Sequence, residues 1–188
     1  MLADRHKGAA LTTPLEWRSY LLEYSDLYLR TADENERDGL DGSQVAAPWL
    51  GYEPAGEEAM SAAEERLGVR FPPSFRGFLQ ASDGWRGVSG WIELLCSCDE
   101  IEWFRATPYG AEFIELYSEE EDNSDVVAVF ERSLLIASGE DFWLLDSAKV
   151  AADGEWTAYE FAPKYGDLAE YARISALMDD SRELMMES

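Results

Sequence analysis

Apolar side chains recur at helical spacing in the first half of the chain, and these segments carry helix-end signals. Residues 13–16, Thr-Pro-Leu-Glu, have the pattern of a capping box with proline at the first helical position. The aromatic and leucine side chains that follow predict a helix over 14–28. The same periodicity predicts helices over 57–67 and 73–81, and Gly68 is expected to end the former.

Between the first two predicted helices the chain becomes polar and rich in turn-forming residues. Residues 31–56 contain two Asp-Gly pairs and further glycines and prolines, which are typical of turns and loops. We therefore expect a long loop or linker here, held against the rest of the molecule by Trp49 and Tyr52.

The second half of the chain contains the short apolar runs that are typical of strands. Residues 92–95 predict one strand. Residues 134–138 and 142–146 flank a Gly-Glu-Asp turn and predict a β-hairpin. Apolar and polar positions alternate over 156–161, which predicts the next strand.

Three further segments of this half have helical patterns. Short helices are predicted over 99–105 and 112–117. Asp167 and Glu170 have the spacing of a capping box, so the last helix is expected to run from Asp167 to Met178. Helices come first, strands follow, and a helix comes last. This order predicts an α+β fold with a mixed, largely antiparallel sheet flanked by helices.

Composition and charge narrow the class of protein. The chain has 188 residues, 46% of them hydrophobic, which is enough to build a core. Its formal net charge is −24, so we expect neither a nucleic acid nor an anionic membrane as partner, because both attract basic proteins. No leader or membrane-spanning segment is evident, and the C-x-C pair Cys96 and Cys98 fits reduced thiols. A cytoplasmic protein is expected.

The residues needed for most catalytic and metal sites are scarce. His6 is the single histidine and there are two cysteines, so zinc sites and Ser-His or Cys-His nucleophiles are not expected. No glycine-rich phosphate-binding motif is present. Paired carboxylates of a glycosidase, or a calcium site in 119–125, remain conceivable, but 39 acidic residues produce such groupings by chance. We expect no enzyme, no cofactor and no metal.

One stretch has a more specific pattern. Residues 64–79, EERLGVRFPPSFRGFL, are followed by Asp83-Gly84-Trp85. A helix ending in Leu-Gly, a short link with proline, and an aromatic helix ending in Phe-Leu resemble the opening of the SUKH superfamily, the Smi/Knr cell-wall regulator-like family. The runs LLIA at 134–137 and FWLLD at 142–146 resemble the central strands of that family.

The resemblance extends over residues 57–184 and implies two parts of the chain. Residues 57–188 would be the SUKH-like domain, and residues 1–56 would be an N-terminal helix and linker that the family pattern does not include. The resemblance also implies a protein-binding domain without a catalytic centre. Bacterial members of the superfamily are immunity proteins that neutralise toxins, often nucleases, and fungal members are regulatory scaffolds.

The acidic residues are unevenly distributed. Residues 87–148 hold 15 acidic residues and two arginines, a net −13 of the total −24. Such a run is often a solvated loop, but it can also form a face that meets a basic partner. The candidate partner-binding residues are Glu112, Glu115, Glu119, Glu120, Glu121, Asp122 and Asp125.

Two hypotheses from different classes follow. The first is an immunity-type inhibitor that binds a basic toxin domain through this acidic face. The second is a cellular scaffold or regulator that docks through residues 1–56. A carbohydrate-binding site on Trp85, Trp91 and Trp103 is a weaker third reading, because buried packing is the commoner use of tryptophan.

Overall fold

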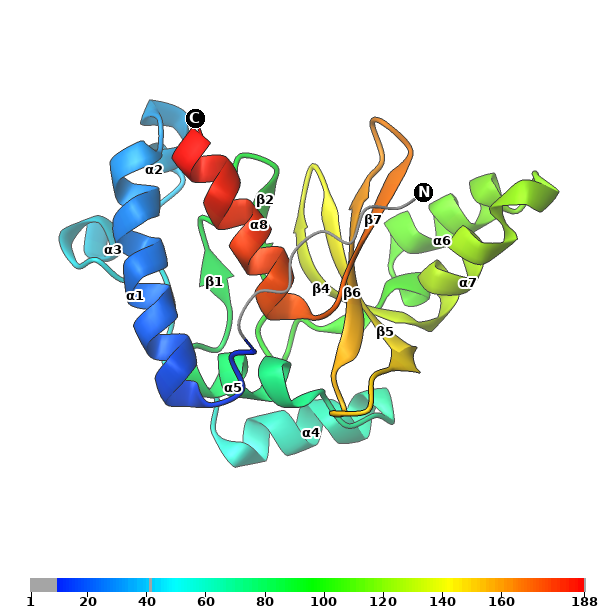
Figure 1. Ribbon diagram of the computed structural model, residues 1–188, viewed down its shortest axis with the longest axis horizontal. Coiled ribbons are helices and arrows are strands. Elements are labelled where there is room, and N and C mark those ends of the chain that lie inside the picture. Colours follow the sequence, from blue (N-terminus) through cyan, green and yellow to red (C-terminus); the bar gives the residue numbers. More distant parts are fainter. Residues whose placement is uncertain (1–9, 41, 188) are drawn as a thin grey trace.

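The computed structural model describes residues 10–40 and 42–187, without the side chains of Val45 and Glu121. The tail that carries His6 lies outside the described residues. Two layers of helices enclose one twisted sheet (Figure 1). None of the described helices is long and apolar enough to cross a membrane.

The described strands form a seven-stranded sheet in the order β1-β2-β4-β5-β6-β7, with β3 beside β4, and every pairing is antiparallel. This confirms the predicted α+β fold. The strands are β1 (Trp85–Arg86), β2 (Ile92–Leu95), β3 (Glu102–Trp103), β4 (Ser133–Gly139), β5 (Phe142–Val150), β6 (Trp156–Ala162) and β7 (Asp167–Tyr171). The predicted hairpin is formed by β4 and β5.

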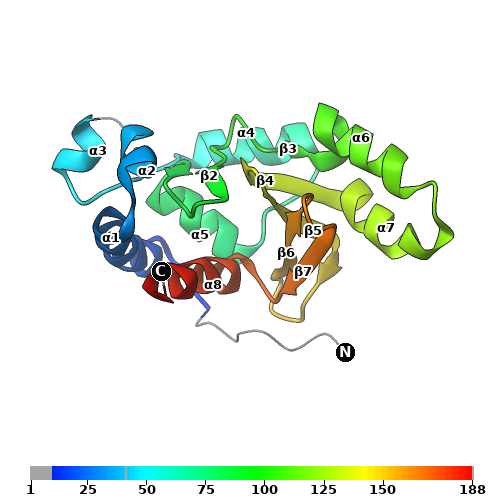
Figure 2. The ribbon, with the colours of Figure 1, turned by 90° about the horizontal axis from the view of Figure 1, so that it is seen from above.

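The central strands bury both faces, which explains their continuous apolar runs. On β5, Trp143 and Leu145 join one hydrophobic cluster, whereas Phe142 and Leu144 join the other. The helices α1 (Pro14–Thr31), α5 (Pro73–Ala81) and α8 (Ile174–Glu187) lie on the first side, and α6 (Pro108–Tyr117) and α7 (Ser124–Arg132) lie on the second (Figure 2).

Helix α1 begins with the predicted capping box and belongs to the main core. The side chains of Trp17, Leu21 and Tyr24 are 0% exposed. The helix packs on α5 and α8, and its entry is tightly fitted, because a Cβ atom at Gly77 of α5 would lie 2.5 Å from the Thr12 carbonyl oxygen. The first helix therefore shares the hydrophobic cluster of the sheet.

The segment predicted as a loop contains two short helices, α2 (Glu34–Asp38) and α3 (Gly42–Ala46). The prediction missed them because α2 has no buried residue and so shows no apolar periodicity. Its start is fixed by a capping box of Asp33 and Glu36. Trp49 does hold this segment, with its ring edge-to-face with Trp85 at 5.1 Å. Helix α4 (Glu57–Leu67) follows and ends at Gly68, whose φ is 69°, as predicted.

One predicted helix begins later than expected and another is wrong. Residues 167–171 are β7, which pairs with β6, and the last helix begins at Ile174. Residues 99–105 do not form a helix: β3 pairs with Leu134 and Leu135 of β4, and the 3₁₀ turn η1 (Phe104–Ala106) follows it. In both places strand pairing with the sheet outweighs a local helix signal.

Candidate functional site

Helices α6 and α7 form a pair at one end of the longest axis of the molecule (Figure 1). They are joined by a turn that includes the short helix η2 (Glu121–Asn123). We call residues 108–132 the acidic hairpin. Its six described candidate residues are all exposed: Glu112, Glu115, Glu119, Glu120, Asp122 and Asp125. The side chain of Glu121 lies outside the described part.

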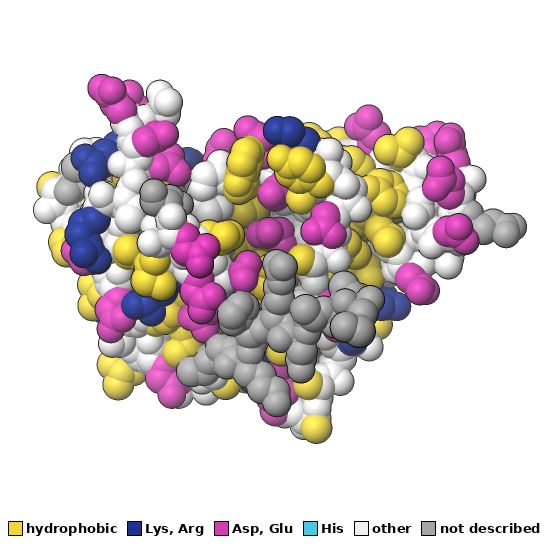
Figure 3. Space-filling view, turned by 45° about the horizontal axis from the view of Figure 1, so that its top comes forward, with side chains coloured by type: hydrophobic (Ala, Val, Ile, Leu, Met, Phe, Trp, Pro, Cys, Tyr) yellow, Lys and Arg dark blue, Asp and Glu magenta, His cyan; other side chains and the backbone are white. Residues whose placement is uncertain are grey.

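The inner side of the acidic hairpin is aromatic, and this forces the carboxylates outward. Phe113 of α6 and Phe130 of α7 both contact Phe161 of β6, with ring centroids 4.9 and 4.7 Å apart. Tyr117 packs edge-to-face on Phe130 at 5.6 Å. Since one side of each helix is buried on the sheet, the remaining positions must face water. Acidic side chains gather at this end of the surface in Figure 3.

The start of α6 is fixed by close backbone packing. Thr107 caps the helix by accepting a hydrogen bond from the Gly110 backbone N–H at 3.0 Å. A Cβ atom at Gly110 would lie 1.8 Å from the Phe104 carbonyl oxygen, so a residue with a side chain does not fit there. The acidic hairpin is thus seated on η1 at its first turn.

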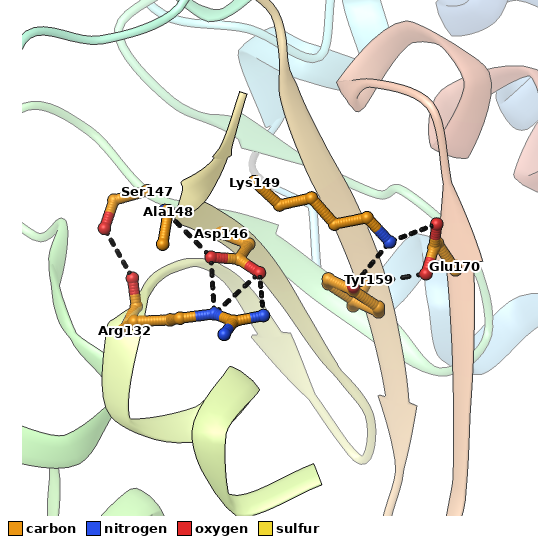
Figure 4. A network of polar contacts seen from close by, with 7 residues as sticks. All are labelled: Arg132, Asp146, Ser147, Ala148, Lys149, Tyr159 and Glu170. Atoms are coloured by element: carbon orange, nitrogen blue, oxygen red, sulfur yellow. Dashed lines mark hydrogen bonds and ion pairs between the residues drawn. The ribbon is translucent and has the colours of Figure 1, made fainter. Parts of the chain in front are cut away.

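The end of α7 is tied to β5 by a buried carboxylate. Asp146 is 0% exposed, and both of its carboxylate oxygens accept from Arg132 Nε at 2.9 Å (Figure 4). Arg132 Nη2 lies 2.9 Å from Asp146 Oδ2, and the Ala148 backbone N–H donates to Oδ1. Hydrogen bonding to Asp146 raises the pKa of Arg132. This pair fixes the base of the acidic hairpin.

A second polar group lies beside it on the sheet. Lys149 Nζ donates to Glu170 Oε1 at 2.6 Å, and the Tyr159 hydroxyl donates to Glu170 Oε2 at 3.2 Å (Figure 4). The bond to Glu170 raises the pKa of Lys149, and burial raises the pKa of Tyr159. Glu170, predicted as a capping residue of the last helix, instead joins β7 to β5 and β6.

The acidic hairpin keeps its charge. Arg105 and Arg132 are the basic residues of 87–148, and both are engaged at its base. The Arg105 guanidinium lies 4.3 Å from the centre of the Trp103 ring and donates to the Glu131 carbonyl oxygen. Among the described residues, none of the six candidate carboxylates forms an ion pair. The result is an exposed anionic surface on a firmly seated helix pair.

The other sequence candidates are not brought together into a site. Trp85 is fully buried, and Trp103 is partly buried with its Nε1 donating to the Leu67 carbonyl oxygen at 3.2 Å. Cys96 and Cys98 are free and buried, and burial raises the pKa of each thiol to about 12. Such thiols are weak nucleophiles at neutral pH because little thiolate is present. Among the described residues no three His, Cys, Asp or Glu side chains are arranged to hold a metal ion.

One surface feature was not predicted. A groove runs between α1, α2, the loop before β2 and the end of α8. Its walls come from segments far apart in sequence, such as Tyr28, Trp91 and Leu184, so no local pattern indicates it.

Comparison with protein families shows which part of the chain has known relatives. The model of the SMI1 / KNR4 family (SUKH-1) matches residues 54–180, more than half of the chain. The protein belongs to this family. The SMI1/KNR4 match begins just before α4, ends within α8, and includes the whole acidic hairpin. Helices α1, α2 and α3 precede it. A comparison with curated proteins found no significant match.

Proposed function

We propose that this protein is a non-catalytic, cytoplasmic protein-binding domain of the immunity type, which binds and neutralises a basic toxin domain. The observation that carries the proposal is the acidic hairpin: six exposed carboxylates without ion-pair partners among the described residues. Membership of the SMI1/KNR4 family supports a binding role. Within this proposal residues 57–188 are the family domain, and residues 1–56 are an added extension.

The expected toxin class is a nuclease, for an electrostatic reason. An enzyme that binds nucleic acid presents lysine and arginine to phosphates. A rigid surface of carboxylates attracts the same side chains and speeds the encounter, by about 10- to 1000-fold for strongly steered pairs. Because Phe113 and Phe130 hold α6 and α7 on the sheet, the helices that carry the carboxylates are in place before binding. Less conformational entropy is then lost when the partner binds.

The test begins with the partner itself. A protein captured from the native cell, or a toxin domain encoded by a neighbouring gene, is purified and its association rate is measured by stopped flow. We expect the rate constant to fall on the order of tenfold between low and physiological salt, because salt screens the steering. Equal rates at both salt concentrations would rule out the acidic hairpin as the steering surface.

A charge-matched pair of variants locates the effect. The variant E115Q/E119Q/E120Q/D122N removes four charges from the acidic hairpin. The control E58Q/E65Q/D99N/E187Q removes four exposed charges elsewhere. We expect the first to slow association on the order of tenfold at low salt and the second to change it less than twofold. Equal slowing by both would mean that net charge, and no particular surface, governs binding.

A regulatory scaffold is the second candidate, and one observation favours it. Leu15 and Leu22 on the outer side of α1 are 79% and 43% exposed, although they are large and apolar. They are seven residues apart and so lie on one face of the helix. Deleting residues 1–56 does not test this role, because Trp17 and Leu21 belong to the core. The variant L15S/L22S tests the scaffold role without disturbing the core. Loss of partner binding with an unchanged melting temperature would favour the scaffold.

A further inference from the structure

Helices α1 and α2 and the end of α8 lie at the opposite end of the molecule from the acidic hairpin (Figure 1). The groove between these helices and the loop before β2 is therefore remote from that hairpin. It consists of two adjoining cavities of about 310 and 360 Å³, which share Tyr28, Glu36, Ser89 and Gly90 in their walls. We call it the α1–α8 groove. Each cavity has room for a side chain, and the four shared residues make the two cavities neighbours.

At the floor of the groove, the backbone of a glycine packs directly on the ring of Tyr28. Gly87 has a φ of 70°, and a Cβ atom there would lie 2.8 Å from the ring of Tyr28. Gly90 also lacks a side chain, so the loop leaves the recess open. Tyr28 is 5% exposed, and its ring is covered by the loop while the groove passes beside it.

The two ends of the groove differ in chemistry. At one end Trp91 and Leu184 are 48% and 55% exposed and line the second cavity together with Met185. This wall is mainly apolar, and the Lys164 ammonium lies 5.7 Å from the centre of the Trp91 ring. At the other end Glu93 lines the first cavity, and Glu36 lies between the two, in the lining of both cavities.

The end of the groove near Glu36 and Glu93 carries negative charge. Glu36 Oε2 accepts from the Asp33 N–H at 2.8 Å, while Oε1 faces Gly90, 3.6 Å from where a Cβ atom would stand. Arg86 also lines this end and donates from Nε to the Tyr52 hydroxyl at 2.9 Å, so two carboxylates face one guanidinium and the balance of charge is negative. Burial, then Glu36, Asp33 and Glu93, raise the pKa of Tyr28 to about 12, as expected beside several carboxylates.

We propose that the α1–α8 groove binds an extended segment of a partner protein that carries a basic side chain next to an apolar one. The basic side chain would lie between Glu36 and Glu93, and the apolar side chain would cover Trp91 and Leu184. An arginine fits the first position well, because its planar group can pair with two carboxylates at once. The proposal does not depend on the acidic hairpin.

Short peptides serve as probes. Acetyl-Arg-Leu-amide is titrated at millimolar concentration into the full chain, and ¹H–¹⁵N NMR follows the amides of 87–91 and the Trp91 indole. Acetyl-Glu-Leu-amide and acetyl-Arg-Ser-amide test the two ends separately. We expect acetyl-Arg-Leu-amide to shift these signals and each comparison peptide to bind at least threefold more weakly. Shifts confined to the acidic hairpin, no shift at 87–91, or equal binding of acetyl-Glu-Leu-amide would overturn the proposal.

Variants connect the binding to the groove. E36Q keeps an oxygen for the α2 capping box, and E93Q alters an exposed side chain, so both should fold. We expect the E36Q/E93Q variant to weaken binding of acetyl-Arg-Leu-amide at least threefold and L184S to weaken it similarly, with melting temperatures unchanged. The control E58Q/E65Q removes the same charge from α4 and should leave binding within twofold of the original. Unaltered binding in E36Q/E93Q would refute the assignment. A dimer in sedimentation experiments that L184S abolishes would also refute it, because the groove would then hold a second copy of the chain.

Discussion

Replacing Arg132 with alanine tests how firmly the acidic hairpin is held. Asp146 is fully buried, and Arg132 supplies three of its contacts at 2.9 Å. Removing one partner of a buried ion pair costs about 3–5 kcal/mol, because the other charge stays buried without compensation. Two features reduce that figure here. Arg132 is 40% exposed, and the Ala148 N–H still donates to Asp146. We therefore expect R132A to lower the free energy of unfolding by about 2 kcal/mol.

The assay is a double-mutant cycle in urea with R132A, D146A and R132A/D146A. Circular dichroism and tryptophan fluorescence should give coincident transitions, which would support a two-state analysis. D146A should cost about 1–2 kcal/mol, because it leaves an arginine that water can reach. The double variant should cost little more than R132A alone, which gives a coupling energy of about 1–2 kcal/mol.

R132K is the matched control, since lysine keeps the charge but cannot form the paired contact of a guanidinium. It should fall between the original protein and R132A. A loss below about 0.5 kcal/mol for R132A, or additive costs in the double variant, would refute the idea that this pair anchors α7 to β5.

Three other predictions concern the core and its charges. Gly110→Ala should cost about 3 kcal/mol or more in urea unfolding, because the added Cβ atom would overlap a backbone carbonyl of η1. Trp17→Ala should cost about 3–5 kcal/mol, since this fully buried ring packs on Phe78 with centroids 5.4 Å apart. Burial raises the pKa of Glu160, so the folded state holds its proton more tightly than the unfolded state, and stability falls as pH rises through that pKa. Glu160→Gln should therefore raise the melting temperature at pH 7, keep an acceptor for Trp143 Nε1, and lose this advantage near pH 4.

Each of these has a control that separates the stated cause from a general effect. Gly42→Ala meets no atom within 4 Å and should be nearly neutral. Trp17→Phe keeps a ring in the core and should cost less than half as much as Trp17→Ala. Glu65→Gln removes an exposed charge and should give no comparable gain at pH 7. If Glu160→Gln is equally stabilising at pH 4 and pH 7, removal of a buried charge is not the cause.

Local signals predicted the fold well where core packing reinforces them. The capping box at Thr13 begins a helix because Trp17 and Leu21 then face the core. Asp167 and Glu170 have similar spacing, but β6 needs a neighbour, and five pairs of residues join it to β7. A capping interaction is worth about 1 kcal/mol, so it cannot decide the matter against the hydrogen bonds of a strand.

Local sequence signals were also insufficient to predict the surface sites in full. The density of carboxylates was evident from the sequence, and their exposure follows from the aromatic residues on the inner side of α6 and α7. The prediction did not reach the α7 helix, because the apolar run 126–130 can be read as a helix or a strand. The α1–α8 groove could not be predicted, since Tyr28 and Leu184 are brought together by the packing of α1 on α8.

That packing joins α1 to α8, two helices far apart in the sequence, and has a consequence for synthesis. Glu23 of α1 forms an ion pair with Arg182 of α8 at 3.0 Å, and the guanidinium lies over the Tyr20 ring. At about 5–20 residues per second, the roughly 160 residues that separate these partners take the ribosome about 8–32 s to add. Throughout that interval the aromatic side of α1 lacks its last covering helix. A nascent chain of this protein should therefore depend on chaperones until α8 emerges, and products truncated before α8 should be degraded quickly.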